Sequence, residues 1–114
     1  MLEKIDHIVL LLDFYGPLLT EKQQRVMSLY YENDLSLTEI AEQLDITRQA
    51  IYDILKRSVS QLEDYEKRLN LVEKFARTQQ ELQAVYDLLN RAEEPGSKEL
   101  AEAVNTIRQV LDLV

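Results

Sequence analysis

The chain has 114 residues, of which 46% are hydrophobic and 30% charged, and its formal net charge is −8 at pH 7. A chain of this length can bury a hydrophobic core in one compact domain and still carry an extension. The absence of cysteine excludes disulfides and thiolate metal sites, and a single histidine excludes the usual zinc ligand sets. No catalytic residue set and no phosphate-binding glycine loop can be recognised, so we expect no enzymatic activity and no cofactor.

Membrane and secretion signals are also missing from the sequence. No apolar run approaches the ~20 residues that a membrane-spanning helix needs. The short apolar run at residues 8–12 follows acidic rather than basic residues, unlike a signal peptide. We therefore expect a cytoplasmic protein with no membrane span.

Helix breakers are sparse, since the two glycines and two prolines occur as pairs at residues 16–17 and 95–96. Elsewhere apolar residues recur every three or four positions, which predicts an all-α protein. A first helix should cover about residues 2–15 and stop at the first breaker pair. Thr20 should cap a second helix, with Gln23 at the reciprocal position of a capping box.

Residues 37–57, LTEIAEQLDITRQAIYDILKR, have the pattern of a helix-turn-helix followed by a longer helix. Ser36 is expected to cap the first helix of the motif and Thr47 the second. Ala41 is small enough for two closely crossing helices, and Asp45 tolerates the left-handed backbone of the turn. This motif would belong to a four-helix head.

The outward side chains of the second motif helix form the candidate nucleic-acid site. Arginine and glutamine at a helix start can read guanine and adenine, while cations further along suit phosphates. Residues 48–77 are the only net positive block, with seven basic and five acidic residues, although Asp53 and the overall charge oppose indiscriminate binding. The alternative to a nucleic-acid site is a helical hairpin inside an α-bundle, with solvated charges on its outer face. The candidate site residues are Thr47, Arg48, Gln49, Tyr52, Lys56 and Arg57.

The C-terminal half has no glycine or proline between residues 48 and 92. Its apolar spacing predicts one helix of about 30 residues, with a weak point at residues 78–80. A second apolar face follows, formed by Leu82, Val85, Tyr86 and Leu89. A turn at residues 93–96 and a last helix capped by Ser97 complete the chain.

We divide the chain into a head, about residues 1–60, and a helical tail, residues 61–114. A long helix that exposes Leu62 and Leu69 needs a partner surface to cover them. Homodimerisation through the tail is the favoured solution. Folding back on the head and docking another protein are the alternatives.

Residues 19–69 resemble the promoter-binding C-terminal domain of bacterial sigma factors. The shared features are a Leu-Thr-capped helix, a Leu-x-Tyr-Tyr segment, a Leu-Thr-Glu-Ile-Ala helix and a Thr-Arg-Gln start to the recognition helix. With its N-terminal helix and acidic helical tail, the whole chain resembles the YlxM family of Gram-positive bacteria. The resemblance implies a link to the signal recognition particle (SRP) pathway, because family genes tend to lie beside the gene for the particle's GTPase. It also implies DNA contacts at the six candidate residues and Asp53.

Two functional hypotheses follow. In the first, the protein is a non-enzymatic regulator in the SRP pathway that binds nucleic acid, DNA in preference to RNA, as a homodimer. In the second, it is a protein-binding adaptor of the SRP GTPase, and the helix-turn-helix is only a scaffold. The acidic tail or the region around Tyr30 and Tyr31 would then contact a basic partner.

Overall fold

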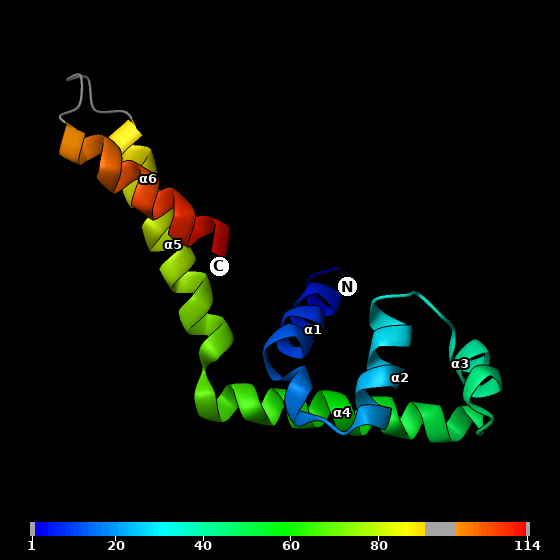
Figure 1. The fold of residues 1–114 in the computed structure, drawn as a ribbon. Helices are drawn as coiled ribbons and strands as arrows, with labels where there is room; N and C mark the ends of the chain where they lie inside the picture. The colour runs from blue at the N-terminus through cyan, green and yellow to red at the C-terminus, as the bar shows by residue number, and fades with distance from the viewer. Residues whose placement is uncertain (1, 91–97, 114) are drawn as a thin grey trace. The chain divides into compact units, whose positions relative to one another are not determined.

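The computed structural model describes residues 2–90 and 98–113, which form an all-α fold, as predicted (Figure 1). No strand occurs in these two ranges, and no helix within them is long and apolar enough to cross a membrane. The elements are α1 (Leu2–Tyr15), the 3-10 turn η1 (Gly16–Leu18), α2 (Glu21–Tyr31), α3 (Leu37–Leu44), α4 (Arg48–Leu69), α5 (Leu71–Asn90) and α6 (Lys98–Leu113).

Contacts group the chain into two compact units, Met1–Val72 and Glu73–Val114. In the first unit, α1, α2 and α3 all pack on α4, with α3 at its N-terminal end and α1 nearer its C-terminal end (Figure 1). The inward face of α4 has the three- and four-residue spacing of an amphipathic helix. Its buried residues are Ile51, Leu55, Ser58 and Leu62.

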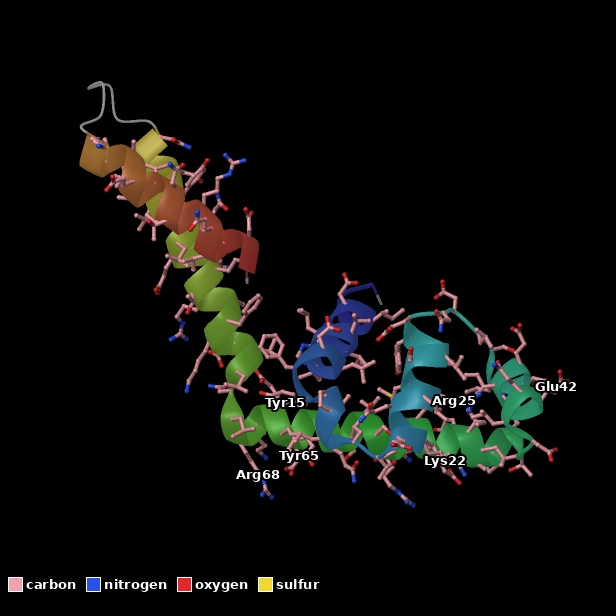
Figure 2. The ribbon with its side chains drawn as sticks, in the orientation of Figure 1. Tyr15, Lys22, Arg25, Glu42, Tyr65 and Arg68 are labelled. Atoms are coloured by element: carbon pink, nitrogen blue, oxygen red, sulfur yellow. The ribbon has the colours of Figure 1, made fainter. Side chains whose placement is uncertain are left out.

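The core of the first unit combines these residues with apolar side chains from the three helices above α4. Burying each large apolar side chain contributes roughly 1.5–3 kcal/mol. Tyr15 of α1 is part of this core, and its ring stacks on Tyr65 of α4 at a centroid distance of 5.9 Å (Figure 2). The other buried apolar residues are Ile8, Leu11, Leu12, Leu19, Val26, Met27, Ile40, Ala41 and Val72.

The end of α1 and the start of α2 fall where the sequence predicts. α1 ends at Tyr15, and a Cβ at Gly16 would lie 3.3 Å from Leu12 Cδ1, so the turn leaves little room for a side chain. Thr20 caps α2 through a capping box: Gln23 N–H donates to Thr20 Oγ1 at 3.2 Å, and Thr20 N–H donates to Gln23 Oε1 at 3.1 Å.

The prediction of one helix of about 30 residues after the motif is wrong. α4 has 22 residues and ends at Leu69, because Asn70 adopts a left-handed backbone (φ 59°, ψ 28°). The predicted weak point, residues 78–80, lies inside α5. A long-range interaction supports the observed break: Tyr15 Oη accepts the Leu71 N–H at 3.0 Å, and a Glu66 oxygen accepts the Val72 N–H at 3.0 Å.

The second unit contains the rest of α5 together with α6. Apolar side chains recur along both helices at intervals of three, four or seven residues, and those that are half-buried are Phe75, Leu82, Tyr86, Leu89, Leu100, Val104, Ile107 and Leu111. Val85, predicted on the same apolar face of α5, is instead 44% exposed. The predicted turn at 93–96 and the Ser97 cap lie outside the described residues. The role of the tail in dimerisation or docking stays a prediction.

Candidate nucleic-acid interface

The turn of the helix-turn-helix has the predicted backbone. Asp45 ends α3 in the left-handed region (φ 55°, ψ 46°), where a short polar side chain is tolerated. The amides of Asp45 and Ile46 both donate to the Ala41 carbonyl oxygen, the second at 3.1 Å. Ala41 is 7% exposed, so its small side chain lies in the packed side of the motif.

Both motif helices carry the predicted N-caps. Ser36 and Glu39 form a capping box at the start of α3, with Glu39 N–H donating to Ser36 Oγ and Ser36 N–H donating to Glu39 Oε1, each at 3.1 Å. Thr47 Oγ1 accepts the Ala50 N–H at 3.0 Å at the start of α4. These caps satisfy amides that have no partner within a helix, and they fix where the recognition helix begins.

The inward anchors of α4 determine which side chains face out. Ile51 is fully buried and Leu55 is 7% exposed, while Ile54 and Ile46 pack partly against the core. The opposite face of the helix must therefore lie at the surface. All six candidate residues, Thr47, Arg48, Gln49, Tyr52, Lys56 and Arg57, are exposed.

One hydrogen bond orders the exposed face at the start of α4. Gln49 Nε2 donates to Asp53 Oδ1 at 3.0 Å, across one helical turn. This bond engages the amide nitrogen of Gln49 and leaves its carbonyl oxygen to accept from a ligand. It also fixes the acidic Asp53 side chain within the candidate surface.

The cations of this surface are not neutralised internally. Among the described residues, Arg48, Lys56 and Arg57 form no ion pair, whereas Arg68 pairs with Asp64 further along α4. Lys56 and Arg57 line a shallow hollow of about 400 Å³ together with Asp53, Ser60 and Gln61. These positive charges are therefore available to an anionic ligand.

The start of α2 adds residues to the site that were not predicted from the sequence. Lys22 lies beside α4 (Figure 2), and it lines a second hollow of about 390 Å³ with Thr20, Gln23 and Arg57. Gln23 Nε2 donates to Gln61 Oε1 at 2.9 Å, which connects α2 to α4 across 38 positions. We call Lys22, Arg48, Lys56 and Arg57 the basic patch.

Lys22 could not be assigned to the site from its neighbours in sequence. Its proximity to Arg57 depends on the packing of α2 against α4, and no local pattern reports that packing. The one available signal was its position in the first turn of a capped helix, in a segment where basic residues are scarce.

These features define the class of the molecule. A short helix, a left-handed turn and an N-capped second helix, packed on further helices, make it a helix-turn-helix protein. The chain belongs to the family described as "Putative helix-turn-helix protein, YlxM / p13 like" (UPF0122), whose sequence model matches residues 2–103. The predicted resemblance to YlxM is thereby confirmed.

Individual relatives agree with the family match. The chain is 54% identical to the UPF0122 proteins of Bacillus cereus strain Q1 and Bacillus anthracis strain A0248. Each match covers 79 residues, which is 69% of this chain and 72% of the relative.

Proposed function

We propose that this protein is a non-enzymatic, cytoplasmic regulatory protein that binds nucleic acid through α4 and the basic patch. The observation that carries this proposal is a set of exposed cations on a helix-turn-helix surface that form no ion pair with any residue the structure describes, in a chain whose net charge is −8. Along α4 and at the start of α2, these cations supply the phosphate attraction that the acidic remainder of the molecule lacks.

We assign base contacts and phosphate contacts to these residues from their positions in the structure. Arg48 and Gln49 lie in the first turn, from which side chains of a recognition helix reach base edges. Lys56, Arg57 and Lys22 lie further from that end and would contact phosphates. The Thr47 hydroxyl already accepts the Ala50 amide, so its own hydrogen remains to donate to a phosphate oxygen.

DNA is the favoured ligand over RNA. A recognition helix fits the wide major groove of B-DNA, whereas the major groove of an A-form RNA helix is too deep and narrow for side chains to read. Single-stranded or looped RNA remains the second choice, because the same cations would meet its phosphates.

We propose that the protein binds as a homodimer through its tail. A single patch of four cations on an acidic chain gives limited affinity. A dimer presents two such patches to one nucleic acid, which strengthens binding without new contacts at either patch. The tail leaves apolar side chains exposed for such an interface, with Val85 at 44%, Leu88 at 67% and Val110 at 36%.

The proposed setting is the SRP pathway, and its support is the family resemblance. The alternative function is an adaptor for the SRP GTPase in which the helix-turn-helix serves as a scaffold. The two differ in one outcome: the adaptor would keep its partner after nuclease treatment, and the nucleic-acid-binding protein would lose a partner held through RNA or DNA.

Direct binding tests the main proposal. The triple variant R48A/K56A/R57A should lose binding to fluorescent duplex DNA and to SRP RNA in low-salt anisotropy titrations. The matched control K67A/R68A/K74A removes the same charge from other exposed positions and should keep most of the affinity. Failure of the native protein to bind either ligand at low salt would contradict the proposal, as would equal losses in the two variants.

A further inference from the structure

A groove of about 500 Å³ lies at the end of α2 that is remote from the basic patch. Its walls come from α1, from the last turn of α2, from the loop before α3 and from the first turn of α3. Ile5, Ile8, Tyr30, Tyr31 and Leu35 are the apolar side chains that line it. Its volume is in the range of sites that bind small ligands or the anchor side chains of a peptide, about 300–1,000 Å³.

The two tyrosines give the groove a shaped apolar wall. The rings of Tyr30 and Tyr31 meet edge to face, with centroids 4.9 Å apart and planes at 79°. Tyr30 is 36% exposed and Ile5 is 44% exposed, while Ile8 lies at 3%. Aromatic side chains lose little entropy on binding and offer both apolar area and a hydroxyl, so such a wall suits an anchor residue.

The rim of the groove is acidic. Asp34 and Glu39 both line it, and neither forms an ion pair among the described residues. The surrounding sequence, residues 26–47, contains five acidic residues and no basic one. Burial raises the pKa of the Tyr31 phenol, and its neighbours Tyr30 and Glu63 of α4 raise it further, in agreement with a negative potential here.

We propose that this acidic groove binds a cationic amphipathic segment of a protein partner. An aliphatic or aromatic anchor of the partner enters between Ile5 and the tyrosine pair, and flanking lysines or arginines meet Asp34 and Glu39. Charge complementarity selects this occupant. Nucleic acid and anionic lipid are repelled by the same carboxylates, and a second copy of the chain brings a net charge of −8 of its own.

The groove and Lys22 of the basic patch lie at opposite ends of α2. Tyr30 and Tyr31 close the C-terminal end of α2, and Lys22 belongs to its first turn, so about 14 Å of helix separates them. The two surfaces share no lining residue. A cationic protein segment and a nucleic acid can therefore be bound at the same time.

Peptide selection tests the chemistry of the partner. The native protein is presented to a random peptide display library, and peptides that also bind the I5S/Y30S variant are removed. Both replaced residues are exposed, so the variant should keep its fold, which circular dichroism checks. The survivors should be rich in lysine and arginine and contain at least one large apolar residue.

A second variant tests the role of charge without disturbing local structure. D34N keeps a residue that tolerates the left-handed backbone (φ 57°), and E39Q keeps an acceptor for the Ser36 amide of the capping box. The double variant D34N/E39Q should bind a synthetic copy of a selected peptide about tenfold more weakly at low salt. The control E21Q/D64N removes two exposed charges outside the groove lining and should change the affinity less than twofold.

Three results would overturn the proposal: neutral or acidic peptides among the survivors, no peptides that distinguish native protein from I5S/Y30S, or unchanged peptide affinity in D34N/E39Q. A dimer that becomes monomeric in I5S/Y30S would identify a second copy as the occupant and equally refute it. These assays contain no nucleic acid, so their outcome is independent of the proposed nucleic-acid function.

Discussion

At the scale of single residues, the proposed recognition surface combines favourable and opposing charges. Arg48 and Lys56 are exposed without ion pairs among the described residues, while Asp53 stands between them along α4, bonded to Gln49. An acidic side chain here weakens general attraction to phosphates and can accept from the amino group of cytosine. Such a surface favours selectivity among base sequences over high affinity for nucleic acid in general.

Ser58 is a residue of a different kind, because it is a polar side chain inside the core. It is fully buried on α4, and its Oγ finds no hydrogen-bond partner among the described residues. Leaving a buried hydroxyl unpaired costs about 1–3 kcal/mol, and an apolar side chain of similar size avoids that cost.

The substitution S58A should therefore raise the free energy of unfolding by about 1 kcal/mol, measured by urea denaturation. The control is S60A, at an exposed position two residues further along α4. It should change stability by less than about 0.5 kcal/mol. A loss of stability in S58A would show that the hydroxyl has a partner in solution.

At the scale of elements, local sequence determines where most helices of the first unit begin and end. The caps at Thr20, Ser36 and Thr47 and the left-handed Asp45 all depend on residues within one turn of each other, so they could be predicted. The break after Leu69 could not, because the acceptor for the Leu71 amide is Tyr15, 56 positions earlier in the chain. The proximity of Lys22 to Arg57, which lines the same hollow, was missed for the same reason.

The α4–α5 junction is the element most dependent on one buried side chain. Tyr15 is 1% exposed, accepts the Leu71 N–H and donates to Glu66 Oε1 at 2.5 Å. The substitution Y15F removes both bonds and should lower the free energy of unfolding by about 1–3 kcal/mol. Hydrogen exchange at the Leu71 and Val72 amides should accelerate, whereas unchanged exchange would contradict this account of the break.

The same tyrosine makes stability depend on alkaline pH. Burial, and then the hydrogen bond to Glu66, raise the Tyr15 pKa above its ordinary value of 10.0. The folded state thus holds the phenol proton more tightly than the unfolded state does. Its contribution is fully present below the ordinary pKa and is lost as pH rises through the raised one. The decline in unfolding free energy above pH 10 should be shallower in Y15F than in the native protein.

At the scale of the whole molecule, the chain has a net charge of −8 and combines a basic patch on α4 and the start of α2 with an acidic groove at the end of α2. Its all-α class and family membership could be predicted from breaker spacing and motif residues. The region around Tyr30 and Tyr31 could be named from the sequence as a contact for a basic partner, but the groove could not, because it forms where α1, α2 and the start of α3 come together.

The proposed homodimer can be tested by a substitution in the tail. The substitution L88D places a charge at an exposed apolar position of α5, 67% exposed in the single chain. Light scattering coupled to gel filtration should find a dimer for the native protein and a monomer for L88D, with equal helix content by circular dichroism. A native monomer, or an unchanged dimer in L88D, would contradict dimerisation through this face of the tail.

The central claim is that the cations of the basic patch bind phosphates, and the salt dependence of DNA binding tests it most directly. Three phosphate contacts, from Lys22, Lys56 and Arg57, predict that log K falls against log salt concentration with a slope of about −3 per bound protomer. The double variant K56A/R57A should reduce that slope towards about −1. A native slope near zero, or the same slope in the native protein and the variant, would contradict the claim.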